Sequence, residues 1–225
     1  MKNQQITIDF KDGASTKINL FQPEKSDNSP IIILTPAMGV KAKYYLPFIE
    51  NLVSKNITCI STDLRGLGES SVRPSSKVDW GYLEMIDELK VISETIKSKF
   101  PNRKIYHLGH SLGGQISLLM TAKNPELSDG FIFIAANSIY YKSWTGMQRF
   151  NVLMGYIFFP IISKLVGYFP GDKVGFGGKA SKTQLIDWAF AGRNGRFKIT
   201  GDNFDYEGGM QQLIKPVLAI YNEGD

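Results

Sequence analysis

The chain has 225 residues, which is enough for one medium-sized domain with its own hydrophobic core, or for such a domain with an insertion. Hydrophobic residues make up 43% of it and charged residues 21%, and these proportions exclude global disorder. The single cysteine, Cys59, excludes an internal disulfide and a cysteine-based zinc site, and it fits a reducing, cytoplasmic location.

The net charge of +5 is unevenly distributed along the chain. Residues 139–200 contain nine basic and two acidic residues, whereas the rest of the chain has 17 basic and 19 acidic residues. The same segment holds 13 of the 27 aromatic residues. This change in composition predicts a core over 1–138, an inserted segment over 139–200 and a continuation of the core over 201–225. No stretch of 18 residues is uninterruptedly apolar, so no membrane-spanning helix is expected.

The predicted elements alternate between strands and helices. Residues 5–10 and 17–21 alternate apolar with polar side chains around Asp12-Gly13, which predicts an antiparallel hairpin. The segment 31–34 is continuously apolar, as expected for a strand that is covered on both faces of a sheet. Four later segments are of similar kind and are also predicted as strands: 57–62, 104–108, 131–135 and 216–221. Helices are predicted between them at 47–54, 80–99 and 112–123. The pattern predicts an α/β fold with a mostly parallel sheet and the hairpin at one edge.

The segment Gly109-His110-Ser111-Leu112-Gly113-Gly114 joins a predicted buried strand to a predicted helix and matches the pattern Gly-x-Ser-x-Gly. A sharp turn of this kind exposes a serine hydroxyl to a base and a substrate, and small flanking residues leave room for it. The alternative is a structural serine in a tight turn. Neither this segment nor the glycine-rich residues 66–71 match the dinucleotide-binding motif, and the chain has no phosphate-loop motif. No cofactor is therefore expected, and no metal site is expected either.

Three further landmarks, together with the serine motif, resemble the α/β-hydrolase superfamily. Residues 35–39 follow a buried strand where that superfamily has its oxyanion loop, with Pro36-Ala37 in place of the usual His-Gly. Residues 63–70 are similar to its Asp-x-Arg-Gly-x-Gly-x-Ser segment, and residues 216–225 to the strand that bears its catalytic acid. The Asp79-Trp80-Gly81 segment and the aromatic insertion resemble a bacterial group of predicted α/β hydrolases most.

The resemblance implies a role for each matching residue. Ser111 would be the nucleophile, Asp225 the acid, and the backbone amides of Met38 and Leu112 the oxyanion hole. The segment from Asp63 to Ser70 would be structural. A serine at this position departs from the members that attack with a carboxylate, such as haloalkane dehalogenases and epoxide hydrolases.

The expected triad also needs a histidine after the acid, and both histidines of the chain, His107 and His110, precede the serine. Neither is expected to be the base. The resemblance implies that the last strand, the last helix and the histidine follow Asp225 in a longer gene product, with 216–221 left as an exposed sheet edge. The other interpretation is a protein that no longer uses a triad.

The resulting hypothesis is a serine hydrolase, an esterase, thioesterase or lipase-like enzyme, acting on carboxylic esters or thioesters with an apolar acyl or aromatic group. Residues 139–200 would form a helical lid, with Trp144, Phe158 and Phe159 in the wall of the substrate pocket. Its basic residues suit anionic substrates or transient contact with a membrane surface. The alternative is a non-catalytic acyl- or lipid-binding protein, or an inactive fragment. No nucleic-acid-binding module is recognisable.

Overall fold

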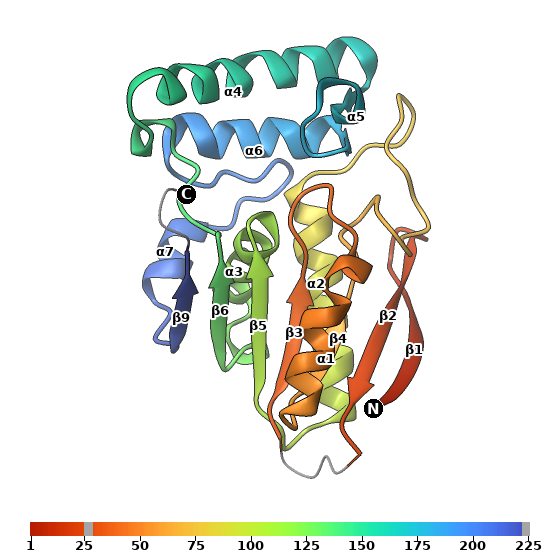
Figure 1. The fold of residues 1–225 in the computed structure, drawn as a ribbon. Coiled ribbons are helices and arrows are strands. Elements are labelled where there is room, and N and C mark those ends of the chain that lie inside the picture. The colour runs from red at the N-terminus through yellow and green to blue at the C-terminus, as the bar shows by residue number, and fades with distance from the viewer. Residues whose placement is uncertain (25–28, 222–225) are drawn as a thin grey trace.

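The computed structural model describes residues 1–24 and 29–221, and its central feature is a seven-stranded sheet (Figure 1). The strand order is β1-β2-β4-β3-β5-β6-β9. The strands β4, β3, β5, β6 and β9 run parallel to one another, and β2 pairs antiparallel with both β1 and β4. The strand bounds are β1 (Lys2–Asp9), β2 (Ser15–Gln22), β3 (Ile31–Thr35), β4 (Thr58–Ser61), β5 (Ile105–His110), β6 (Gly130–Ile134) and β9 (Val217–Ile220). The sheet predicted from the sequence, with its hairpin at one edge, is confirmed.

The two edges of the sheet differ in how they are covered. β1 begins at Lys2, three residues earlier than predicted, and its partner β2 buries Ile18 and Leu20 against the core. At the opposite edge β9 pairs with β6, and all four of its residues are exposed. The exposed edge strand predicted for this segment is therefore present.

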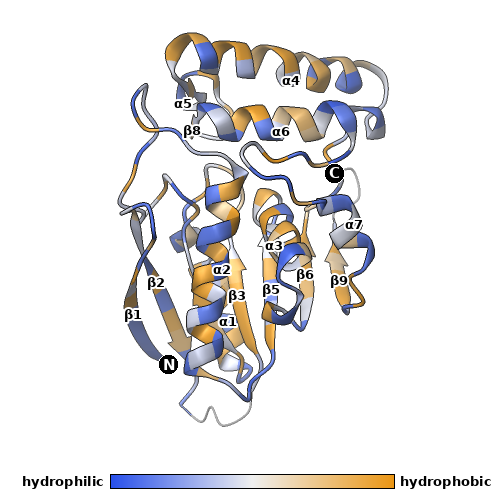
Figure 2. Cartoon of the chain, turned by 180° about the vertical axis from the view of Figure 1, so that it is seen from behind, coloured by the Kyte–Doolittle hydropathy of each residue, from blue (hydrophilic) through white to orange (hydrophobic). Residues whose placement is uncertain are grey.

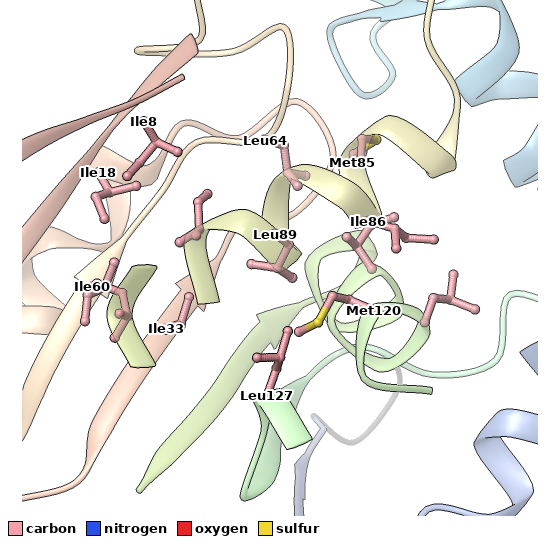
Figure 3. Packing of buried hydrophobic residues seen from close by; sticks show 14 of the residues in the cluster. Ile8, Ile18, Ile33, Ile60, Leu64, Met85, Ile86, Leu89, Met120 and Leu127 are labelled. Atoms are coloured by element: carbon pink, nitrogen blue, oxygen red, sulfur yellow. The ribbon is translucent and has the colours of Figure 1, made fainter. Parts of the chain in front are cut away.

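Helices cover both faces of the sheet because side chains alternate along each buried strand. Ile31 and Ile33 of β3 belong to the main core with α2 (Tyr82–Lys99) and α3 (Leu112–Lys123), part of which Figure 3 shows. Ile32 and Leu34 face the other way and pack with α1 (Leu46–Ser54). The shorter elements on the core are η1 (Ala42–Tyr45), η2 (Pro125–Leu127) and α7 (Tyr206–Gln211).

The helix boundaries follow local chemistry. The backbone N–H of Gly81 donates to a carboxylate oxygen of Glu84 at 2.7 Å, so α2 begins at Tyr82, two residues later than predicted. The predicted helix 112–123 has the observed bounds of α3, and α1 begins at Leu46 with a proline in its first turn.

A second layer of helices lies over the ends of the central strands that point toward the top of Figure 1. Its elements are η3 (Tyr141–Ser143), α4 (Gly146–Val166), β7 (Tyr168–Pro170), α5 (Gly171–Val174), β8 (Lys179–Ser181) and α6 (Lys182–Asn194). We call residues 139–194 the upper layer. A helical lid was expected over 139–200 without bounds for its elements, so the limits of α4 and α6 and the small β7/β8 sheet come from the structure.

The helix α4 continues through its internal proline, because the carbonyl that loses its intrahelical hydrogen bond accepts one from a side chain of α6. Pro160 has no N–H for the carbonyl of Tyr156, four residues earlier. The Arg193 guanidinium of α6 donates a hydrogen bond to that carbonyl. The α4 and α6 helices are therefore joined at the proline.

Among the described residues, α4 is the one helix whose length and apolar composition would allow it to cross a membrane. Only 17% of its most apolar window is buried inside the protein. The expectation of no such segment rested on uninterrupted apolar runs, and Lys164 and Ser163 interrupt the run here. Figure 2 shows hydrophobic residues along most of this outermost helix.

Candidate active site

Ser111 lies in the turn between β5 and α3 and has a strained backbone conformation. Its φ is 49° and its ψ is −116°, which a residue with a side chain rarely adopts. The turn is held by two hydrogen bonds, from Ser111 N to the carbonyl of Ile134 at 3.0 Å and from Gly114 N to the carbonyl of Ser111 at 2.9 Å. This is the geometry that the Gly-x-Ser-x-Gly motif predicts.

The glycines around Ser111 are required by close backbone contacts. A Cβ atom at Gly109 would lie 2.2 Å from the Cα of Gly114. One at Gly113 would lie 2.1 Å from the carbonyl oxygen of Thr35 and 2.6 Å from that of Pro36. The missing side chain at Gly113 therefore brings the start of α3 against the loop that follows β3.

That loop, residues 35–40, is tied to the serine turn through a tyrosine that the sequence analysis did not identify. The Tyr45 hydroxyl accepts a hydrogen bond from the Ala37 N–H at 3.2 Å and lies 2.7 Å from Nδ1 of His110. The two rings meet edge to face, with centroids 5.9 Å apart. Burial raises the pKa of Tyr45, so its hydroxyl stays protonated at neutral pH. Tyr45 thus bridges the two backbone segments that flank the serine.

Two backbone N–H groups in this region, those of Leu112 and Met38, are free to donate to a bound ligand. The N–H groups in the first turn of any α-helix lack intrahelical acceptors, and Leu112 is the first residue of α3. In the other segment, Ala37 N donates to Tyr45 and Val40 N donates to the Ala37 carbonyl. Among the described residues the Met38 amide between them has no acceptor.

A cavity of about 390 Å³ opens between the serine turn and the upper layer. It is lined mainly by apolar side chains, and Ser111, Met38 and Leu112 form its floor. Trp144 and Phe159, both predicted as wall residues, line it together with Trp188 of α6. Phe159 and Trp188 stack with ring planes 11° apart.

Phe158, the third predicted wall residue, has a different position. It does not line the cavity, and 54% of its surface is exposed. Adjacent residues on a helix point about 100° apart, so the inward position of Phe159 directs Phe158 away.

The two histidines of the chain have structural contacts. His107 is fully buried in β5, with Nε2 3.4 Å from the carbonyl oxygen of Leu127. Burial lowers the pKa of His107 to about 4, so its ring is neutral at pH 7. His110 is the partner of Tyr45. Asp225, predicted as the acid, lies outside the described residues.

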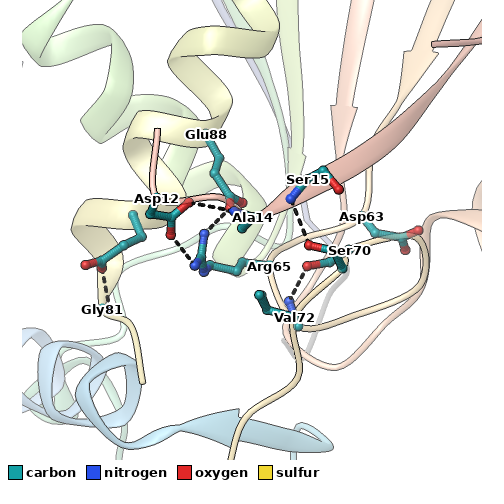
Figure 4. Close-up of polar contacts among 12 residues, drawn as sticks. Asp12, Ala14, Ser15, Asp63, Arg65, Ser70, Val72, Gly81 and Glu88 are labelled. Atoms are coloured by element: carbon teal, nitrogen blue, oxygen red, sulfur yellow. Dashed lines mark hydrogen bonds and ion pairs between the residues drawn. The ribbon is translucent and has the colours of Figure 1, made fainter. Parts of the chain in front are cut away.

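The segment from Asp63 to Ser70 makes structural contacts, as expected from the sequence, and Figure 4 shows those of Arg65. The Asp63 carboxylate accepts hydrogen bonds from the N–H of Ala42 at 2.7 Å and of Glu69 at 3.1 Å. The Arg65 guanidinium lies between the carboxylates of Asp12 and Glu88 and pairs with both.

The upper layer is attached to the core through Asp187 of α6, which the sequence analysis also missed. Its buried carboxylate accepts hydrogen bonds from Tyr82 N at 2.9 Å, Thr200 N at 3.1 Å and the Thr200 hydroxyl at 2.5 Å. Nearby, Thr183 donates from its N–H and its hydroxyl to Asp79, at 2.9 and 2.8 Å. These bonds fix α6 above the cavity.

Comparison with known proteins relates the chain to hydrolases. The serine aminopeptidase S33 family matches residues 26–183. A putative carbamate hydrolase, RutD, from Agrobacterium fabrum is 31% identical over 109 residues, which are 48% of this chain and 39% of that protein. A monoglyceride lipase homolog from Monkeypox virus is 30% identical over 106 residues, 47% of this chain and 37% of that protein. The matched regions thus span less than two-fifths of these relatives.

Solved structures share the fold over nearly the whole chain. A thermostable carboxyl esterase from Bacillus coagulans, solved with glycerol, superposes with a TM-score of 0.63 and covers 98% of this chain and 90% of its own. Its sequence identity is 14%, so this likeness concerns the fold alone.

Proposed function

Because the chain belongs to the serine aminopeptidase S33 family of α/β hydrolases, we propose that it is a serine hydrolase of carboxylic esters or thioesters that forms an acyl-enzyme on Ser111. One observation carries the proposal: Ser111 occupies a strained strand-to-helix turn that opens into an apolar cavity. A protein that used this serine only for packing would gain nothing from the strain.

The proposed reaction proceeds in two steps. The Ser111 oxygen attacks the carbonyl carbon, its proton passes to a base, and the alcohol or thiol departs protonated as the acyl-enzyme forms. Water then attacks the acyl carbonyl while the base takes its proton, and the bond to the Ser111 oxygen breaks, which releases the carboxylic acid as the serine regains a proton. The negative oxygen of each tetrahedral intermediate would accept hydrogen bonds from the Met38 and Leu112 amides, which line the cavity floor beside Ser111.

The proposal assigns the acid to Asp225 and uses neither His107 nor His110 as the base. The contacts of the two histidines in the chain support this assignment. His107 is buried and tied to Leu127, and His110 is engaged by Tyr45.

The cavity supports an apolar acyl or aromatic group as substrate. Its volume of about 390 Å³ falls in the range of small-molecule sites, and aromatic rings of α4 and α6 form its roof. In this proposal the upper layer acts as a lid. The names of two relatives, a monoglyceride lipase homolog and a putative carbamate hydrolase, support hydrolysis at a carbonyl carbon.

A second function, non-catalytic binding of an acyl or lipid ligand, fits the same cavity and needs no base. A serine-directed fluorophosphonate probe separates the two functions, because covalent labelling requires an activated hydroxyl. We expect labelling of the wild-type protein and none of Ser111→Ala, with hydrolysis of medium-chain nitrophenyl esters lost in parallel. Absence of labelling in the wild-type protein, with retained binding of a fatty acid, would establish the binding function instead.

A further inference from the structure

α4 is apolar on two opposite faces, and only one of them is used inside the protein. The inner face contacts α6, where Tyr156 meets Trp188 with ring centroids 4.5 Å apart. Phe159 and Gly155 of the same face line the cavity. A helix that only covered a core would be polar on its other side.

The outer face of α4 instead carries a continuous apolar stripe. Its members are spaced by three or four residues, so they lie on one side of the helix. Leu165 is 82% exposed and Met147 72% exposed. The outer stripe comprises Met147, Phe150, Met154, Phe158, Ile161 and Leu165. A 21-residue helix is about 30 Å long, and Figure 1 shows α4 lying across the top of the molecule.

The charged residues of α4 and of the segments that directly flank it are all positive. Residues 139–171 contain Lys142, Arg149 and Lys164 and no aspartate or glutamate. All three cations are exposed. An apolar face with basic residues beside it is the composition of a helix that binds at the surface of an anionic bilayer.

We propose that the outer stripe docks the protein on an anionic lipid bilayer, with α4 lying in the plane of the interface. A spanning orientation conflicts with the inner face, which is bound to α6 by the Arg193–Tyr156 hydrogen bond and by aromatic packing. A second copy of the chain fits less well, because two such faces would bring like charges together.

Docking in this orientation would connect the bilayer to the cavity. The outer stripe faces the lipid, while the inner face of the same helix forms the cavity roof above Ser111. An apolar substrate dissolved in the bilayer would therefore reach the cavity past a single helix. Docking itself does not depend on the hydrolytic function, since Ser111 takes no part in it.

Vesicle flotation tests the proposal. The full chain is mixed with vesicles of phosphatidylcholine alone or of phosphatidylcholine with phosphatidylglycerol. We expect flotation with the anionic vesicles, weakening as salt is raised, and little with the neutral ones. Ser111→Ala should float as the wild type does, so a failure of the proposed hydrolysis leaves this result unchanged.

Two pairs of variants locate the contact. Phe158→Ser with Leu165→Ser should lower the partition coefficient about 100-fold, since burying each side chain is worth about ten-fold or more. Ile214→Ser is the control, because Ile214 is an apolar residue outside the upper layer that is 95% exposed. This variant should have no effect on the partition coefficient. Lys142→Gln and Lys164→Gln should each weaken binding about five-fold.

All these side chains are exposed, so thermal denaturation should confirm that the variants fold as the wild type does. Three results would overturn the proposal: no flotation with anionic vesicles, equal flotation with both vesicle types, or equal loss in the Ile214→Ser control. Concentration-dependent dimerisation that Phe158→Ser with Leu165→Ser abolishes would identify a second copy as the occupant and would also overturn it.

Discussion

Removal of a single hydroxyl at Tyr45 tests how the serine turn and the loop after β3 are held together. In Tyr45→Phe the ring remains, but the Ala37 N–H loses its acceptor and Nδ1 of His110 loses that contact. Ala37 is buried, so its unpaired N–H costs about 1–3 kcal/mol of the free energy of unfolding. For a domain of this size each kcal/mol lowers Tm by about 2–4 °C.

The same change should slow the reaction of Ser111. Loss of one oxyanion donor costs about 10²–10³ in rate, and a displaced loop is expected to lose part of that, about ten-fold. The effect should fall on kcat, or on the rate of phosphonate labelling, and leave KM nearly unchanged. Tyr44→Phe is the matched control, because Tyr44 is the adjacent tyrosine and is 69% exposed.

The measurements are thermal denaturation and the labelling rate of Ser111 in the three proteins. We expect Tyr45→Phe to have a lower Tm and a slower labelling of Ser111 than Tyr44→Phe. If the two variants had the same Tm and the same labelling rate, the bridge between the loop and the serine turn would have no energetic role. A lower Tm with an unchanged labelling rate would make Tyr45 a stabilising residue and not a positioning residue.

Two further predictions concern β5 and the start of α3. His107, with its pKa lowered to about 4 by burial, binds fewer protons in the folded than in the unfolded state, where the ordinary value is 6.5. The neutral ring therefore contributes fully to the free energy of unfolding above pH 6.5, and this contribution, on the order of 3 kcal/mol, is lost as the pH falls toward 4. Urea unfolding of His107→Gln should show a smaller loss of stability than the wild type between pH 6.5 and 4, and equal losses in the two proteins would refute this role of His107. Gly113→Ala places a Cβ 2.1 Å from the Thr35 carbonyl oxygen, so it should cost about 1–3 kcal/mol and reduce labelling of Ser111. Gly146→Ala meets no neighbouring atom but has a φ of 53°, so it should cost backbone strain and leave labelling unchanged.

Much of the core was determined by short-range patterns in the sequence. The continuous apolar run at 31–34 predicts a strand buried on both faces, and the structure places that strand in the middle of the sheet. The Gly-x-Ser-x-Gly motif predicts the strained turn, because only that backbone path needs small residues at Gly109 and Gly113. Such patterns can be read because backbone geometry fixes them within a few residues.

The tertiary structure decided which side chains meet across long separations in the chain. Tyr45 and His110 are 65 residues apart, and Asp187 reaches Tyr82 over 105 residues, so no local spacing could pair them. The α4 helix shows the same limit in another form. It is apolar nearly all round, so its sequence specifies a helix but not which side faces the protein. Packing on α6 turned Phe159 toward the cavity and left Phe158 on the exposed outer stripe, because only the position of a neighbouring element decides which face of such a helix is buried.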